Sequence, residues 1–165
     1  MSVIMVASAK GGVGKSTLCV GLGNIFSEHS KKTLLIDMDI GVRSLDLLLN
    51  VAEKTVYNWG DVLLGNCEAK KALITVSKNM SLLPAPVSLS EEFSADVMKS
   101  LIELYKTQFD YILLDAPAGI EVGFELSVKC AEQCIIVSTP DPISVRAASS
   151  AAQLVRKSGV NDIRL

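Results

Sequence analysis

Five short runs of apolar residues recur along the chain, each bounded by charged residues, glycine or proline. They cover residues 3–7, 33–36, 80–83, 111–114 and 134–137. Apolar runs without alternating polar positions are typical of strands that are covered on both faces, so the pattern predicts buried strands. Residues 160–165 look like the opening of a further strand, and we expect the chain to stop within that element.

Longer amphipathic segments lie between these runs and predict helices over residues 16–27, 55–64, 91–106, 122–131 and 144–157. Ser88 and Glu91 have the spacing of a capping box and predict the start of the third helix. Because strands and helices alternate, we expect an α/β fold with a mostly parallel sheet and helices on both faces. No repeat or linker divides the chain, so residues 1–165 are predicted to form a single domain.

The composition is that of a folded chain. Hydrophobic residues make up 49% of the 165 residues and charged residues 21%, and the net charge is −2. The chain contains no polybasic block and no apolar run of about 20 residues, so neither nucleic-acid binding nor a membrane span is expected. We place the protein in the cytoplasm, because the N-terminus opens directly into a predicted strand without a charged leader.

Cysteine and histidine do not form a metal-binding pattern. The chain has one histidine, His29, and no CxxC pair, so a zinc site is not predicted. We expect His29 to be solvated at a helix end. We expect Trp59, Leu45 and residues 47–49 to lie in the core. The thiols are expected to be buried as small hydrophobic groups, and they belong to Cys19, Cys67, Cys130 and Cys134.

Residues 9–17, Ala-Lys-Gly-Gly-Val-Gly-Lys-Ser-Thr, follow the first predicted strand and open a helix. They match the phosphate-loop pattern G-x-x-x-x-G-K-[ST], except that Ala9 replaces the first glycine. Glycines let backbone N–H groups turn around phosphate oxygens at close range. In this pattern Lys15 contacts the β- and γ-phosphates and Ser16 binds Mg²⁺. The alternative is a glycine-rich turn that binds nothing.

Carboxylates follow two of the predicted strands. Asp115 ends the run 111–114, at the position from which a Walker-B carboxylate helps to hold Mg²⁺. Asp37 and Asp39 follow the run 33–36 and point the same way if the backbone stays extended. One of them is expected to face the metal and the other to orient the attacking water. The alternatives are a helix cap for Asp115 and a solvated turn for the pair.

The chain resembles the deviant Walker-A ATPases of the MinD/ParA class, and within it the MinD branch that acts in septum-site selection. The resemblance covers residue 3 to the end and is carried by residues 10–17, 37–47, 57–67, 115–121 and 139–146. It implies a three-layer P-loop NTPase fold and an ATPase that forms a face-to-face homodimer with ATP between the subunits. The function expected is a Mg-ATP-dependent molecular switch in spatial positioning, such as division-site selection.

The resemblance also implies roles for individual residues. Lys10 would reach the nucleotide of the partner subunit, Asp39 would position the hydrolytic water, and Asp115 would support Mg²⁺. From the strand-end pattern, Asp37 is expected to be a further Mg²⁺ ligand beside Ser16 and Asp115. Thr17 would contact the α-phosphate, and Asp141 would lie near the ribose across the dimer. The residues expected to bind ATP are therefore Gly11, Gly12, Val13, Gly14, Lys15, Ser16, Thr17 and Asp141.

Two features depart from the family. The family continues beyond residue 165 with a base-binding strand and a terminal amphipathic helix that docks on anionic membrane, so this chain by itself is expected to lack both and not to bind membrane. The resemblance implies a regulatory partner of the Min type. Ala147, Ala148 and Ser149 stand where better-known members carry the acidic residues used in partner binding.

Two other functions were weighed against the ATPase. The first is an interaction module that holds ATP without hydrolysing it. The second is a reductase of the nitrogenase-iron-protein type, which shares the phosphate loop but needs cluster cysteines at the subunit interface. Cys19 lies inside the first predicted helix, and Cys130 and Cys134 come well after Asp115. The cysteine positions therefore favour the ATPase over the reductase.

Overall fold

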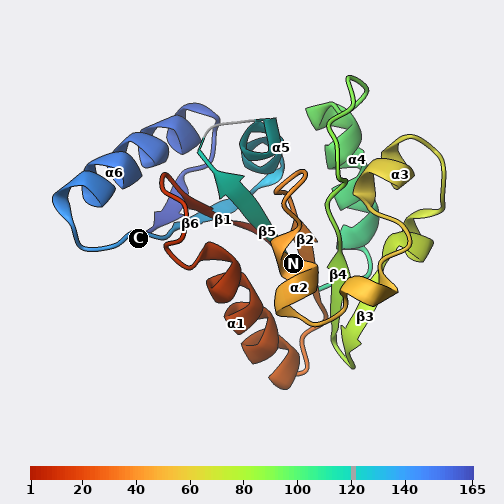
Figure 1. Cartoon of the computed structure of the whole chain (residues 1–165). Coiled ribbons are helices and arrows are strands. Elements are labelled where there is room, and N and C mark those ends of the chain that lie inside the picture. Colours follow the sequence, from red (N-terminus) through yellow and green to blue (C-terminus); the bar gives the residue numbers. More distant parts are fainter. Residues whose placement is uncertain (120–121) are drawn as a thin grey trace.

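One sheet organises the chain in a computed structural model that describes residues 1–119 and 122–165 (Figure 1). Within these residues the sheet has seven strands in the order β3-β4-β2-β5-β1-β6-β7. Every neighbouring pair is parallel except β3 and β4. The strands are β1 (Ser2–Ser8), β2 (Thr33–Asp37), β3 (Ile74–Ser77), β4 (Met80–Leu83), β5 (Tyr111–Ala118), β6 (Gln133–Ile136) and β7 (Asp162–Arg164).

The apolar runs are strands, as predicted, and the expected strand after residue 160 is present as β7. The sequence analysis missed β3. This strand lies at one end of the sheet, and Ile74 and Val76 pack inward whereas Thr75 and Ser77 are exposed. Only two apolar residues in four therefore marked it, which is too weak a pattern to separate from a loop.

The helices in the described residues are α1 (Lys15–Glu28), α2 (Ser44–Leu48), α3 (Trp59–Leu63), α4 (Ala95–Lys106), α5 (Val122–Cys130) and α6 (Pro142–Lys157), with short 3₁₀ turns η1 (Ala52–Lys54) and η2 (Ala69–Ala72). None of these helices is long and apolar enough to cross a bilayer. The predicted start of the third long helix is wrong. Helix α4 begins after Ser94, whose hydroxyl accepts a hydrogen bond from the Val97 N–H at 3.3 Å.

The helix predicted over residues 55–64 is also too long. Helix α3 starts only after Asn58, which forms a reciprocal capping box with Asp61. The residues before it are a 3₁₀ turn and extended backbone. The pair of hydrogen bonds between Asn58 and Asp61 therefore sets the start of this helix, and the hydrophobic period placed that start too early.

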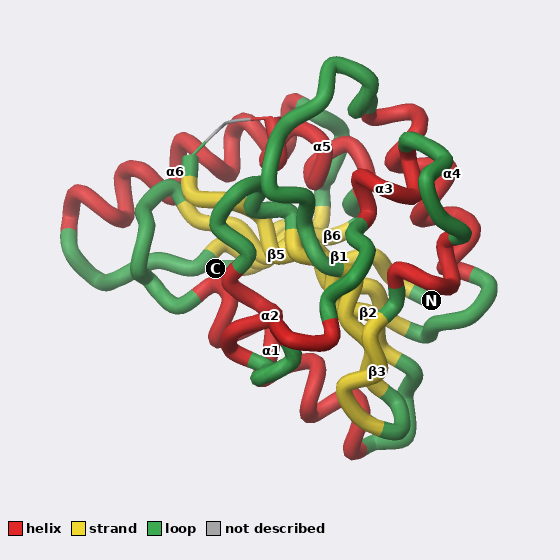
Figure 2. Tube along the Cα trace, turned by 45° about the vertical axis from the view of Figure 1, so that its right-hand side comes forward, coloured by secondary structure: helices red, strands yellow, loops and turns green. Residues whose placement is uncertain are grey.

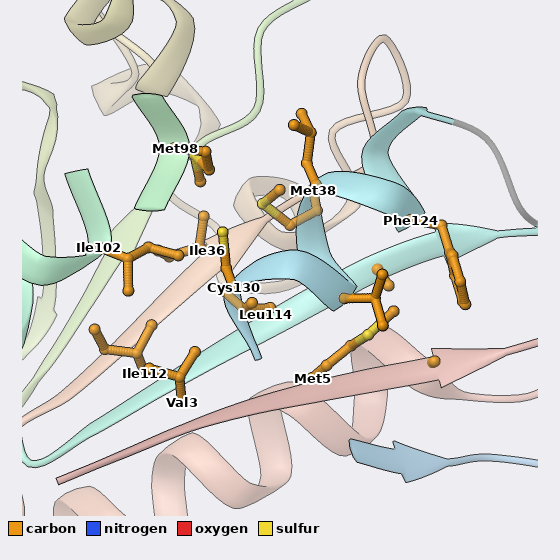
Figure 3. Close-up of a cluster of buried hydrophobic side chains, with 14 of the residues drawn as sticks. Val3, Met5, Ile36, Met38, Met98, Ile102, Ile112, Leu114, Phe124 and Cys130 are labelled. Carbon is orange, nitrogen blue, oxygen red and sulfur yellow. The ribbon is translucent and has the colours of Figure 1, made fainter. Parts of the chain in front are cut away.

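The side chains of alternate strand residues pack into two separate hydrophobic cores, one on each face of the sheet. Val3, Met5 and Ile36 face the core under α4, α5 and α6, and Figure 3 shows them with Phe124 and Cys130. Ile4, Val6 and Leu35 face the opposite core, which is covered by α1 and α2. Figures 1 and 2 show the sheet between these two helical layers. The expected three-layer α/β architecture is confirmed.

The core prediction for the residues around α2 is only partly correct. Trp59 and Leu45 are fully buried. Leu47 and Leu48 are 69% and 53% exposed, because α2 is one short helix that turns a single face inward. An apolar run that looked like core therefore leaves two leucines on the surface.

Helix α5 approaches the end of β2 so closely that only glycine fits at position 123. A Cβ there would lie 2.3 Å from the Met38 carbonyl oxygen and 3.0 Å from Pro117. Gly123→Ala is therefore expected to lower the free energy of unfolding by about 1–3 kcal/mol, measured by urea denaturation. Gly21→Ala in α1 is the control, because its Cβ would meet no atom within 4 Å. It should stabilise the helix, and equal destabilisation by both changes would contradict the close approach.

Candidate functional site

The loop between β1 and α1 is shaped by two glycines. Gly12 and Gly14 have φ angles of 73° and 98°, in the left-handed region that side chains rarely adopt. Gly14 is the N-cap of α1, and its carbonyl accepts the Leu18 N–H at 2.9 Å. The free N–H groups and partial positive charge of the helix N-terminus therefore lie at this loop, which is the arrangement that binds phosphate.

Two carboxylates lie side by side at the carboxyl edge of the sheet. The register of β2 and β5 pairs Asp37 directly with Asp115, and each residue is 1% exposed. Burial raises the pKa of Asp37 to about 6 and that of Asp115 to about 7. The negative charge of Asp37 adds to the rise at Asp115, whereas the nearby ammonium of Lys15 opposes it. The buried lysine of the phosphate loop thus acts on Asp115.

Asp37 has backbone donors at both of its oxygens. Its Oδ1 accepts the Asp39 N–H at 2.9 Å, and its Oδ2 accepts the Leu45 N–H at 3.0 Å. These two bonds hold the segment from Asp39 to the start of α2 against the end of β2. The structure gives Asp37 this positioning role, and its expected role as a Mg²⁺ ligand stays a prediction.

The buried carboxylate of Asp115 has a different environment from that of Asp37. Among the described residues no group completes a hydrogen bond of normal geometry to either oxygen, although the Ser16 hydroxyl is near enough to lower the pKa of Asp115. Ser16 itself lies 3.2 Å from the Ser44 hydroxyl, oxygen to oxygen. A buried carboxylate without donors, next to a hydroxyl and a phosphate loop, fits Mg²⁺, which usually binds one or two carboxylates together with substrate phosphates.

Asp39 lies in the loop after β2 and is half-buried. It borders a pocket of about 210 Å³ whose other walls include Pro117, Val122 and Gly123. Its carbonyl accepts the N–H groups of Val42 and Arg43, each at 3.3 Å, which closes the turn before α2. The structure thus brings Asp39 to the same sheet edge as Asp37 and Asp115, as the sequence predicted.

Lys10 and Asp141 lie on the exposed side of the site. Asp141 caps α6, accepting hydrogen bonds from the Ser144 N–H at 2.9 Å and the Thr139 hydroxyl at 2.7 Å. The Ser144 side chain, together with the Thr139 hydroxyl and the Ser144 N–H, holds the pKa of the Asp141 carboxyl well below its usual range, and the charge of Lys10 contributes to the same shift. Asp141 is thus a helix cap in this structure, and its predicted contact with the ribose stays a prediction. Thr17 is exposed in the first turn of α1.

Sequence reasoning missed two residues that build the site. The Trp59 indole N–H donates to the Asp37 carbonyl at 2.9 Å, which ties α3 to the end of β2. The N–H of a buried tryptophan needs an acceptor, and this requirement is the one signal in the sequence that points to a polar contact of Trp59. The Ser44 hydroxyl partners Ser16, and nothing in the sequence marked it. Arg43, the N-cap residue of α2, forms an ion pair with the buried Asp46 of that helix.

Most of the cysteines are buried, and one of them lies near the acidic strand ends: burial raises the pKa of Cys19, and the charges of Asp115 and Asp37 add to the rise. Cys19, Cys130 and Cys134 are buried and Cys67 is half-buried, largely as expected. Burial raises the pKa of Cys134 to about 12, so this thiol stays protonated at neutral pH. Within residues 1–119 and 122–165 no group of three or more His, Cys, Asp and Glu side chains forms a metal site. The buried cysteines give the reductase alternative no support.

A strand-to-helix phosphate loop beside a buried acidic residue, at the carboxyl edge of a parallel sheet, defines a P-loop nucleotide-binding protein. The ParA family model, described as NUBPL iron-transfer P-loop NTPase, matches residues 1–164. The chain therefore belongs to this family of P-loop NTPases, and the resemblance found in the sequence is confirmed.

Septum site-determining proteins MinD are among its relatives. The one from Synechocystis sp. is 43% identical over 166 residues, which are 99% of this chain and 62% of that protein. The one from Thermotoga maritima is 37% identical over 167 residues, again 99% and 62%. This chain thus spans about 62% of the length of these curated relatives.

Solved structures of the same group share the fold. A chain of the MinC:MinD cell division protein complex from Aquifex aeolicus matches with a TM-score of 0.89 at 36% identity, covering 99% of this chain and 66% of that one. MinD complexed with Mg-ADP from Pyrococcus horikoshii OT3 matches with a TM-score of 0.87 at 27% identity, covering 98% and 67%.

The buried carboxylates make stability depend on pH. Since the pKa of Asp115 rises from 3.8 to about 7 on folding, the folded state binds more protons than the unfolded state across that range. The free energy of unfolding therefore falls as pH rises through it. In urea denaturation without nucleotide or Mg²⁺, Asp115→Asn should flatten this fall and raise stability at about pH 8 by on the order of 1–3 kcal/mol.

The control for this experiment is Asp96→Asn, which removes an exposed carboxylate from the first turn of α4. It should leave the pH dependence of the wild type in place. If Asp115→Asn shows the same pH dependence as Asp96→Asn, the account of Asp115 as a buried and destabilising charge is wrong.

Proposed function

We propose that the chain is the nucleotide-binding part of a MinD-type ATPase that acts as a switch in division-site placement. The observation that carries the proposal is Asp115, buried and without protein donors among the described residues, facing the Ser16 hydroxyl of the phosphate loop. A group of this kind is costly in the absence of a cation and fits a site built for Mg-ATP. The MinD relatives, one of them complexed with Mg-ADP, support the same ligand.

The proposed roles follow from the positions of the groups. The loop from Gly11 to Gly14 and the N-terminus of α1 bind the phosphates, and Lys15 neutralises part of their charge. Ser16 and Asp115 hold Mg²⁺, which polarises phosphoryl oxygens when it is bound. Asp39, fixed to Asp37 through its backbone N–H, orients water toward the γ-phosphate.

Association of two copies is the proposed second part of the mechanism. Large apolar side chains are exposed in segments that follow strand ends at the carboxyl edge, among them Val42 and Ile143 at 64% and 79% exposure. Such a surface favours a partner that covers it. In a face-to-face homodimer the exposed Lys10 is free to act in trans, as an arginine finger does, and to neutralise charge on the nucleotide of the partner subunit.

A protein partner of the Min type is the finer proposal. It is supported by the Aquifex aeolicus complex of MinC with MinD. On α6, Ser149 is exposed whereas Ala148 is 4% exposed and packs toward the sheet. Ala147 is half-buried, so Ser149 is the most exposed of the three residues that stand where other members carry acidic groups.

Lys15→Ala tests nucleotide binding. The triphosphate would lose its main side-chain cation while keeping its own charge, so we expect Mg-ATP affinity to fall by about 10- to 150-fold. Isothermal titration calorimetry measures this directly. Lys31→Ala, an exposed lysine beyond the end of α1, is the control and should bind as the wild type does. Unchanged affinity in Lys15→Ala would refute the phosphate-loop assignment.

Lys10→Ala tests the dimer. This variant should bind ATP as a monomer but lose ATP-dependent association, and turnover should fall by about 10³-fold or more. Asp39→Ala should bind nucleotide and associate but hydrolyse it slowly, because only the water-orienting group is removed. Light scattering with ATP then compares Asp39→Ala with the double variant Lys10→Ala, Asp39→Ala. Equal dimerisation of the two would remove Lys10 from the mechanism.

A further inference from the structure

The sheet ends at β3 with an edge that pairs with no strand of the described residues. β3 binds β4 on one side only, and β4, β2 and β5 separate it from β1 and the phosphate loop. Figures 1 and 2 show β3 at this outer end of the molecule. In a strand paired on one side, about every second residue directs its N–H and C=O groups outward. β3 therefore presents main-chain donors and acceptors that can bind another strand.

A groove of about 570 Å³ lies along this edge. It is lined by Leu73, Ile74 and Thr75 around the start of β3, and by Val56 and Tyr57 from the segment before α3. Val56 is 77% exposed although it is apolar. The groove therefore combines an unpaired strand edge with apolar contacts, which is the combination used when an extended peptide adds a strand to a sheet.

The walls of the groove are held in place by the rest of the fold. The Tyr105 hydroxyl donates to the Ala69 carbonyl at 2.8 Å, which anchors η2 to helix α4. On the other side, the Lys54 N–H donates to the Val51 carbonyl at 2.9 Å. A groove with fixed walls requires little ordering when a ligand binds.

Two lysines mark the rim. Lys54 and Lys71 both line the groove and are exposed. Lys71 lies 3.7 Å from Glu68, nitrogen to oxygen, but both side chains are more than half exposed, so water screens the pair and the ammonium stays available. The groove is thus apolar inside and positive at its edges.

We propose that this groove binds an extended peptide segment of a partner protein, with apolar side chains alternating with acidic ones, as an added strand on β3. The apolar residues contact Val56 and Tyr57, and the acidic residues meet Lys54 and Lys71. A second copy of this chain is the alternative occupant of the same edge, and the test below distinguishes it from a peptide of a partner protein. The site is separate from the phosphate loop and does not depend on the proposed ATPase function.

The test begins with a phage-displayed library of random heptapeptides selected against the whole chain. Selection should enrich peptides that alternate apolar and acidic residues. The double variant Lys54→Glu, Lys71→Glu should bind a synthetic copy of the enriched peptide about tenfold more weakly by fluorescence anisotropy. Lys99→Glu, Lys129→Glu is the matched control, with two exposed lysines on α4 and α5 reversed and the net charge changed equally. It should bind nearly as the wild type does.

Two further measurements separate strand addition from charge attraction alone. The peptide should protect the amides of residues 74–77 from hydrogen exchange, and methylating its backbone nitrogens at alternate positions should abolish binding. Val56→Asp should weaken binding without altering the thermal midpoint of the free chain, since Val56 is exposed. The proposal is overturned by enrichment without acidic residues, by equal binding to the charge-reversed variant, or by equal binding of the methylated peptide. Protection of residues 74–77 that rises with protein concentration in the absence of peptide would assign the edge to a second copy, and that outcome also overturns the proposal.

Discussion

Two carboxylates are buried against each other where β2 and β5 end, and the arrangement of the site depends on how each is compensated. Asp37 accepts two backbone N–H groups, whereas Asp115 finds no such donor among the described residues. Leaving a charge in a poorly solvated place is expensive, so the first carboxylate is stabilised by the fold and the second is left for a cation from outside. Asp37 thus holds the loop in place, and Asp115 is available to a ligand.

The loop that carries Asp39 follows from this difference. Its start and end are held by the same carboxylate of Asp37, and the carbonyl of that residue also accepts the Trp59 indole N–H. Trp59 packs edge-to-face against Phe93, with ring centroids 4.9 Å apart, in the core under α4. The position of the loop is therefore coupled to the packing on one face of the sheet, while the phosphate loop and α1 pack on the other.

The middle of the sheet and its edge at β3 present different groups to a ligand. In the middle of the sheet, parallel strands bring their carboxyl ends together, and residues far apart in sequence share one site. At β3 the chain turns antiparallel and leaves an edge, where main-chain groups rather than side chains define what can bind. Ligand binding in the middle and peptide binding at the edge are compatible, since three strands lie between β3 and β1.

The strands other than β3, the phosphate loop and the acidic strand ends could be predicted from the sequence alone. Continuous apolar runs such as residues 111–114 allow few alternatives to a buried strand. A phosphate loop is recognised from adjacent residues alone, because its lysine directly follows a glycine-rich turn. The family was recognisable from the same motifs, and the family model and the MinD relatives confirm it. The roles of Lys10, Asp39 and Asp141 stay predictions.

Which of these groups act on one another depends on the tertiary structure. The pairing of Asp37 with Asp115 depends on the register of two strands that lie far apart along the chain. The start of α4 at Ser94 depends on a local cap hydrogen bond that competes with an equally plausible one nearby, the wrongly predicted cap at Ser88. Hydrophobic pattern fixes which faces are buried, but strand register and buried charges depend on contacts between distant residues, and the linear sequence does not display those contacts.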